Sequence, residues 1–128
     1  LQAVREFSSL PEAQALAAAN KRIGNILRKA GIEALPGFDA GALTEPDEKA
    51  LAGIMAALAP QVDAAMRDRR YGAALAAMAQ ARDPVDRFFD SVMVMAEDPV
   101  VRQNRLALLA RLRAMMNRVA DISKLTAG

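Results

Sequence analysis

Apolar side chains recur along most of the chain at spacings of three and four residues, the period of one face of an α-helix. The pattern predicts helices over about 10–30, 70–82, 84–93 and 98–120, and a further helix that starts after Thr44. Residues 1–9 have the pattern of the end of a preceding helix. No segment shows the sustained alternation of a strand. We therefore expect an all-α domain, a helical bundle of about five to six helices.

Prolines, glycines and capping residues set the expected helix ends. Ser8 or Ser9 can cap the helix that has Pro11 in its first turn, and Gly31 can end it. Residues 31–45 are rich in turn-forming residues and predict an irregular connection. Pro60 interrupts the next helix. Residues 60–69 then either continue that helix past a kink or form a separate short helix.

Composition narrows the classes of function. The 128 residues include no Cys and no His, so disulfides, thiolate nucleophiles, Cys-ligated zinc and the commonest general base are excluded. No apolar run approaches the roughly 20 residues of a membrane span. A Cys-free chain fits a cytoplasmic location. Because the chain opens without Met and in the pattern of a helix end, we expect a single domain, 1–128, excised from a longer protein.

The acidic pairs do not form a convincing catalytic centre. Asp47 and Glu48, like Asp83 and Asp86, lie near expected helix starts, where carboxylates complement the helix dipole. The serines have no His to activate them, and no phosphate-binding glycine loop or metal-ligand cluster is present. We therefore expect neither an enzyme acting alone nor a cofactor or metal held by this domain.

The helix over 10–30 places its polar and apolar residues on opposite sides. Leu16, Ile23 and Leu27 form an apolar stripe. Four cations and one amide fall opposite: Lys21, Arg22, Asn25, Arg28 and Lys29. This face is either a solvated surface with cations at the negative helix end or a ridge that follows phosphates, and the helix alone does not decide between them.

The last helix carries five arginines and no acid between 102 and 118. Its expected buried face is Val101, Leu108, Leu109, Leu112, Met115, Met116 and Val119. Arg105 lies within that face, where a guanidinium needs a carboxylate, and the acids near it in sequence are Asp90, Glu97 and Asp98. A structural ion pair is favoured over ligand contact. The other four predict a second basic surface: Arg102, Arg111, Arg113 and Arg118.

Three further features are assigned mainly to packing. Phe88 and Phe89 could stack RNA bases, but their helical spacing favours the core. Met93 and Met95 are also expected to pack. Asn20 lies on the apolar side of its helix, and a local structural hydrogen bond is the favoured role.

Five segments carry a further signal: AAANKRIGNILRK (17–29), VDRFFDSVMVM (85–95), DPVVRQNR (98–105), LALLARLR (106–113) and VADISKL (119–125). Together they resemble the C-terminal end of the β subunit of bacterial glycyl-tRNA synthetase. The resemblance covers nearly the whole chain and is weakest over 31–45. AMMNRV (114–119) departs from the family, which is expected to have an aromatic there, and this affects only local packing.

The resemblance implies an anticodon-binding (DALR-type) domain, similar to that of arginyl-tRNA synthetase. Its expected partners are the anticodon arm of glycine tRNA, the α subunit and the remaining β-subunit domains, with no DNA and no membrane. The implied class II ligase is an α/β assembly that uses ATP and magnesium mainly in the α subunit. The alternative is a structural module that docks other synthetase parts with little RNA contact.

The resemblance also supplies the candidate tRNA-binding residues, carried over by their positions in the matching segments. They are Lys21, Arg22, Asn25, Arg28, Lys29, Arg102, Arg105, Arg111 and Arg113.

Overall fold

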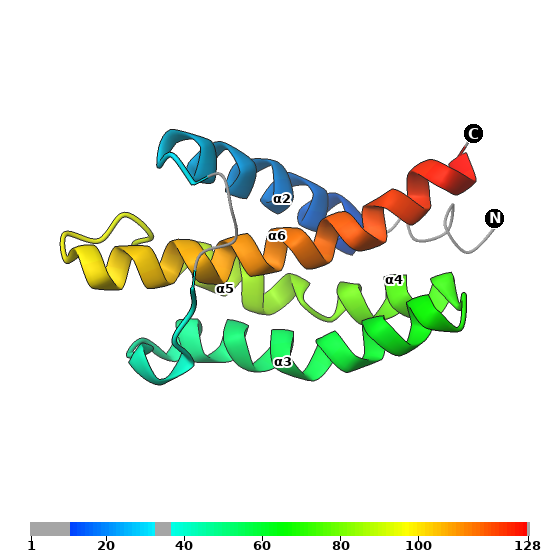
Figure 1. Cartoon of the computed structure of the whole chain (residues 1–128), viewed down its shortest axis with the longest axis horizontal. Helices are drawn as coiled ribbons and strands as arrows, with labels where there is room; N and C mark the ends of the chain where they lie inside the picture. The colour runs from blue at the N-terminus through cyan, green and yellow to red at the C-terminus, as the bar shows by residue number, and fades with distance from the viewer. Residues whose placement is uncertain (1–10, 33–36, 128) are drawn as a thin grey trace.

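The computed structural model describes residues 11–32 and 37–127, and in those residues it contains helices and no strand. Within these residues, five α-helices and one short 3-10 helix follow one another (Figure 1). They are α2 (Pro11–Lys29), η1 (Ala40–Ala42), α3 (Pro46–Arg67), α4 (Tyr71–Ala79), α5 (Arg82–Ser91) and α6 (Pro99–Ala127). The predicted all-α class is confirmed. The expected end of a preceding helix, at 1–9, and its capping serines lie outside the described residues.

Helix α6 is the central element of the bundle. It packs against α2, α3 and α4, while α5 packs against α2 and α3. In Figure 1, α2 lies on one side of α6 and α3 on the other. Residues 105–110 are all buried. Because successive side chains point about 100° apart, this run means that α6 is enclosed on every side over these residues of its N-terminal half.

The core consists of aliphatic side chains with one ring at its centre. Ile23, Leu51, Leu75, Phe88 and Leu109 are each at most 2% exposed. The predicted face of α6 is largely confirmed, since Leu108, Leu112, Met116 and Val119 are buried, whereas Val101 and Met115 are only half-buried. None of the described helices is both long and apolar enough to cross a membrane.

Helix α2 has the predicted bounds. It begins at Pro11, whose fixed φ and missing N–H suit a first turn. It ends just before Gly31, which has a φ of 75°, a left-handed conformation that glycine adopts without steric cost. Ile32 then donates from its main-chain N–H to the carbonyl of Leu27 at 2.9 Å.

Helix α3 continues through Pro60, so the first of the two alternatives for 60–69 is correct. Pro60 is exposed, while Leu58 and Val62 on either side of it are completely buried. The side-chain amide of Gln61 donates to the carbonyl of Ala57 at 3.2 Å, one turn back. Burial of the flanking apolar residues therefore outweighs the proline's local cost of about 3 kcal/mol.

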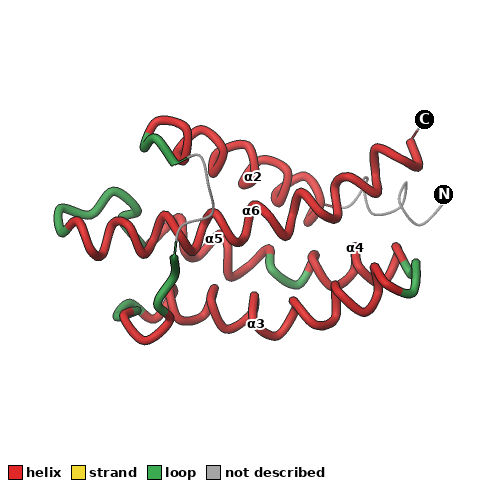
Figure 2. Tube along the Cα trace, in the orientation of Figure 1, coloured by secondary structure: helices red, strands yellow, loops and turns green. Residues whose placement is uncertain are grey.

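Several other helix bounds differ from the sequence prediction. Helix α4 ends at Ala79 instead of near 82, and α5 ends at Ser91 instead of near 93. Helix α5 begins at Arg82, before Pro84, because a proline in a first turn removes no intrahelical hydrogen bond. Helix α6 runs to Ala127 instead of ending near Ala120. The short turn between α4 and α5 is visible in Figure 2.

The connection between α2 and α3 is attached to the start of α6. The main-chain N–H of Asp39 donates to Asn104 Oδ1, and Asn104 Nδ2 donates to the carbonyl of Asp39, each at 2.9 Å. Asp39 also caps η1, which lies within the predicted irregular segment. This two-way contact fixes the described part of the connection against the bundle.

The prediction that Met93 and Met95 pack in the core is wrong. Both lie in the α5–α6 connection and are 69% and 53% exposed. The chain leaves the helical conformation at Val92, which is extended. Helical spacing therefore no longer applies beyond it, and the alternation of an extended segment buries Val92 and Val94 instead.

Candidate nucleic-acid interface

The outer face of α2 presents the cations that the sequence placed opposite the apolar stripe. Lys21, Arg22, Arg28 and Lys29 are exposed, and Leu16, Ile23 and Leu27 are buried. Asn25 is half-buried between them and accepts a hydrogen bond of 2.8 Å at Oδ1 from Arg28 Nη2. The predicted separation of the two faces is confirmed.

These four cations have no carboxylate partner within the described part of the chain. The ion pairs recorded there join Arg67 and Arg70 to Asp68, Arg82 to Asp86, Arg105 to Glu48, and Arg118 to Asp63. None of them involves α2. Within the described residues, the charge of these four cations is therefore not neutralised by an ion pair. Arg28 and Lys29 lie in the last turn of α2, where they offset the negative end of the helix dipole.

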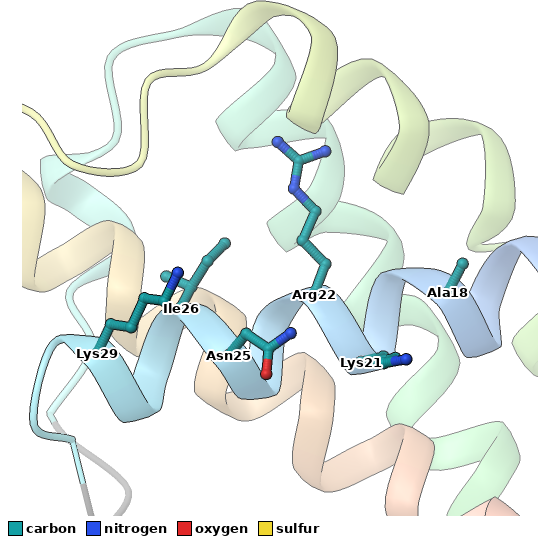
Figure 3. A pocket seen from close by; sticks show the side chains of 6 residues that line it. All are labelled: Ala18, Lys21, Arg22, Asn25, Ile26 and Lys29. Atoms are coloured by element: carbon teal, nitrogen blue, oxygen red, sulfur yellow. The ribbon is translucent and has the colours of Figure 1, made fainter.

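A shallow hollow runs along the same face. Its lining residues all come from α2 and recur at helical spacing: Ala18, Lys21, Arg22, Asn25, Ile26 and Lys29. Figure 3 shows Arg22, Ile26 and Lys29 extending to one side of the helix, with Asn25 between them. Such a surface can place two or three ammonium and guanidinium groups along an extended anion.

Arg22 also joins α2 to α5. Its guanidinium carbon lies 4.3 Å from the centre of the Phe89 ring, a cation–π contact. Phe89 is half-buried and meets Phe88 edge-to-face, with ring centres 5.8 Å apart and planes at 82°. The prediction that both rings belong to the core is confirmed for Phe88, whereas Phe89 is only partly buried against the core.

The predicted second basic surface on α6 does not form one free surface. Arg102 donates to the carbonyl of Ala96 at 3.1 Å, and Arg118 pairs with Asp63. Arg113 donates to the carbonyl of Asn20 at 2.8 Å. Arg111 is exposed, with its guanidinium 5.7 Å from the Phe38 ring centre. These side chains connect α6 to neighbouring segments.

Arg105 forms the predicted structural ion pair, but with a different acid. Its Nε lies 3.0 Å from Glu48 Oε2, its Nη2 lies 3.3 Å from Oε1, and its Nη1 donates to the carbonyl of Met93 at 2.6 Å. The expectation of Asp90, Glu97 or Asp98 as partner is therefore wrong. Arg105 is 7% exposed, so its donors are directed into the protein.

Glu48 also caps α3, as its position predicted. Its Oε1 accepts from the main-chain N–H of Glu45 at 2.9 Å. Burial raises the pKa of this carboxyl, but hydrogen bonds from Arg105 and from the N–H groups of Glu45 and Thr44, with the nearby charge, lower the pKa below its ordinary value. Glu48 thus stabilises both a helix start and a buried guanidinium.

Asn20 makes long-range contacts and not the expected local one. Its Nδ2 donates to Asn117 Oδ1 at 2.9 Å, and its Oδ1 accepts from Arg113 Nη1 at 3.2 Å. A Cβ added at Gly24 would lie 2.7 Å from the same Nη1. This network fixes α2 against α6.

No cluster of three or more metal-ligating side chains occurs among the described residues. The side chains on the outer side of α2 and α5 can therefore interact with a ligand through charge, hydrogen bonding and stacking. Such an arrangement can hold an extended anion through charge and hydrogen bonding.

The model of the DALR anticodon binding domain family matches residues 16–127. The chain is 54% identical to the glycine–tRNA ligase β subunit of Leptothrix cholodnii and 54% identical to that of Thiobacillus denitrificans. It is 56% identical to that of Dechloromonas aromatica. Each match covers 99% of this chain but only 18% of the relative's length. Because the family model spans most of the chain, this protein belongs to the DALR anticodon binding domain family.

Proposed function

We propose that this chain is the tRNA-binding module of a glycine–tRNA ligase β subunit and recognises the anticodon arm of glycine tRNA. The family description and the names of the relatives support the class of ligand. Aminoacylation, with ATP and magnesium, takes place in a cytoplasmic class II assembly with the α subunit. This domain contributes by holding the tRNA in place.

The observation that carries the proposal is the unneutralised basic face of α2. Lys21, Arg22, Arg28 and Lys29 are exposed along one helix face, and no described carboxylate pairs with them. A nucleic-acid backbone bound there releases its condensed counterions, which favours binding and makes it dependent on salt.

The α6 arginines contribute less in this proposal. Arg102 and Arg113 already donate to main-chain carbonyls, and Arg105 is buried with Glu48. Arg111 is the one candidate on α6 with an exposed guanidinium that makes no hydrogen bond or ion pair with the described residues. We therefore place the main RNA contact on α2.

Replacing Lys21 and Lys29 by Ala tests this placement. Binding of a glycine anticodon stem-loop is measured by fluorescence anisotropy over a range of salt concentrations. The slope of log affinity against log salt should fall in magnitude by about 2, since each phosphate contact contributes about 0.9. The control is K49A/R67A, which removes two exposed cations from α3, on the other side of α6. Equal slopes in both variants would exclude α2 as the RNA contact.

Charge reversal within the complete ligase separates RNA binding from docking. K21E/R22E/R28E should abolish charging of glycine tRNA while the α and β subunits still co-elute in size-exclusion chromatography. Loss of the assembly would instead support the alternative, in which this face of α2 docks other synthetase parts.

A further inference from the structure

We propose that the groove between α2 and α5 binds an unpaired nucleobase that carries an exocyclic amino group. This inference rests on the proposed RNA binding and adds a base-reading site beside the phosphate-binding face. The groove is lined on the α2 side by Ala15, Ala18, Ala19 and Arg22, and on the α5 side by Asp86, Phe89 and Asp90.

The α2 wall leaves room for a flat ligand. Its alanines recur at 15, 18 and 19, on the turn before Arg22, so only methyl groups project into this part of the groove. Ala19 is buried and Ala18 is exposed, which places the wall at the boundary between core and solvent. An apolar wall of this kind can contact the face or edge of a planar ring.

Arg22 and Phe89 supply a stacking surface. The guanidinium lies over the Phe89 ring at 4.3 Å, and Phe89 rests edge-to-face on the completely buried Phe88. The Phe89 ring is therefore held in place by the core, and the guanidinium of Arg22 lies over it on the side toward solvent. Bases in single-stranded RNA stack on both aromatic rings and guanidinium planes.

Asp86 and Asp90 determine which ligand suits the groove. Both are exposed on the same face of α5 as Phe89, and Asp86 Oδ2 lies 3.7 Å from Arg82 Nε. Asp90 makes no hydrogen bond or ion pair with the described residues. Ionised carboxylates only accept hydrogen bonds, so they repel phosphate and bind donors such as the amino group of a base.

The groove adjoins the hollow on α2, because Ala18 and Arg22 line both. Cations therefore lie on one side of Arg22, and carboxylates with an aromatic ring lie on the other. A nucleotide bound across Arg22 would place its phosphate toward Lys21 and Lys29 and its base toward Asp86 and Asp90. Phosphate contacts then give affinity, and base contacts give selectivity.

The test compares two RNAs that differ in one functional group. Fluorescein-labelled octacytidylate and octauridylate have rings of equal size, but cytosine has an amino group where uracil has a carbonyl oxygen. Anisotropy titrations of the 128-residue chain should give an affinity for octacytidylate about tenfold higher. D86N/D90N should reduce that ratio to about twofold or less, since an amide can donate as well as accept. D68N/D83N removes two carboxylates outside the groove and should keep the ratio.

A second variant tests the stack. R22K keeps the charge but loses the planar guanidinium, so octacytidylate affinity should fall several-fold with an unchanged salt slope. Equal binding of both octamers by the wild-type chain, or a ratio unchanged in D86N/D90N, would overturn the base site while salt-dependent RNA binding still supports the proposed function. Failure of the chain to bind either octamer or the anticodon stem-loop would overturn both.

Discussion

Arg113 donates from Nη1 to the main-chain carbonyl of Asn20 at 2.8 Å and so joins α6 to α2. The guanidinium occupies the space beside Gly24, where a methyl group would come within 2.7 Å of the same nitrogen. The absence of a side chain at Gly24 therefore allows the contact that orients the basic helix. The amide of Asn20 reinforces it by donating to Asn117.

Gly24→Ala should destabilise the wild-type chain and stabilise an Arg113→Ala chain. In the wild type, the new methyl group displaces the guanidinium, whose hydrogen bonds contribute about 1.5–3 kcal/mol. Without Arg113, only the helix propensity remains, and it favours Ala by about 1 kcal/mol. Urea denaturation followed by circular dichroism of the four chains gives the coupling free energy. A coupling below about 0.5 kcal/mol would show that Gly24 and Arg113 act independently.

Arg105→Met should lower the free energy of unfolding by about 3–5 kcal/mol, because it leaves the buried Glu48 carboxylate without its partner. The side chains of Arg105 and Glu48 are 9% and 3% exposed, so solvent cannot replace the lost contact. Arg111→Met, at an exposed position on the same helix, should change the free energy of unfolding by less than about 1 kcal/mol. Chemical denaturation measures both. Similar losses of unfolding free energy in the two variants would show that the pair of Arg105 and Glu48 does not stabilise the fold more than an exposed arginine does.

The Glu48 pair should also make stability depend on acid. The folded-state pKa of Glu48 lies below its ordinary value of 4.5. Its contribution is therefore fully present above the unfolded-state pKa and is lost as the pH falls through the folded-state pKa. Glu48→Gln does not titrate, so the wild type should exceed it in stability at neutral pH, and the gap should narrow below about pH 4.5. Melting temperatures across that range measure the gap. A constant difference would show that the charge of Glu48 is not responsible.

Met93 and Met95 should be oxidised before the core methionines. They are 69% and 53% exposed, whereas Met55 and Met78 are 8% and 2% exposed. Dilute hydrogen peroxide followed by peptide mass spectrometry gives the order of sulfoxide formation. Unfolding in urea before the treatment should abolish the difference. Equal rates in the native chain would mean that the α5–α6 connection is covered or that the core opens readily.

The separation of faces on α2 could be predicted from the sequence because it depends only on local geometry. A residue every 100° puts Ile23 inside and Arg22 and Arg28 outside, whatever α2 packs against. The same reasoning failed at Met93, because the helix ends at Ser91 and the period changes there. At Pro60 the local signal was misleading in the other direction, because it suggested a break where the helix continues. The burial of Leu58 and Val62 outweighs the cost of a proline inside a helix.

Partners distant in the sequence could not be predicted in the same way. Because burying the charge of Arg105 is costly, the sequence predicted that this side chain pairs with a carboxylate. The pattern of apolar and polar residues did not indicate that the partner is Glu48, at the start of another helix. The contact of Arg22 with Phe89 depends on how α2 and α5 meet, and so does the groove that Asp86 and Asp90 share with them.

The sequence by itself determined the helices, the absence of His and Cys, and the basic face of α2, since each follows from residue identity and helical period. Only the tertiary structure decided which arginines of α6 form ion pairs or hydrogen bonds, because their partners come from segments that are close in space and distant in the sequence.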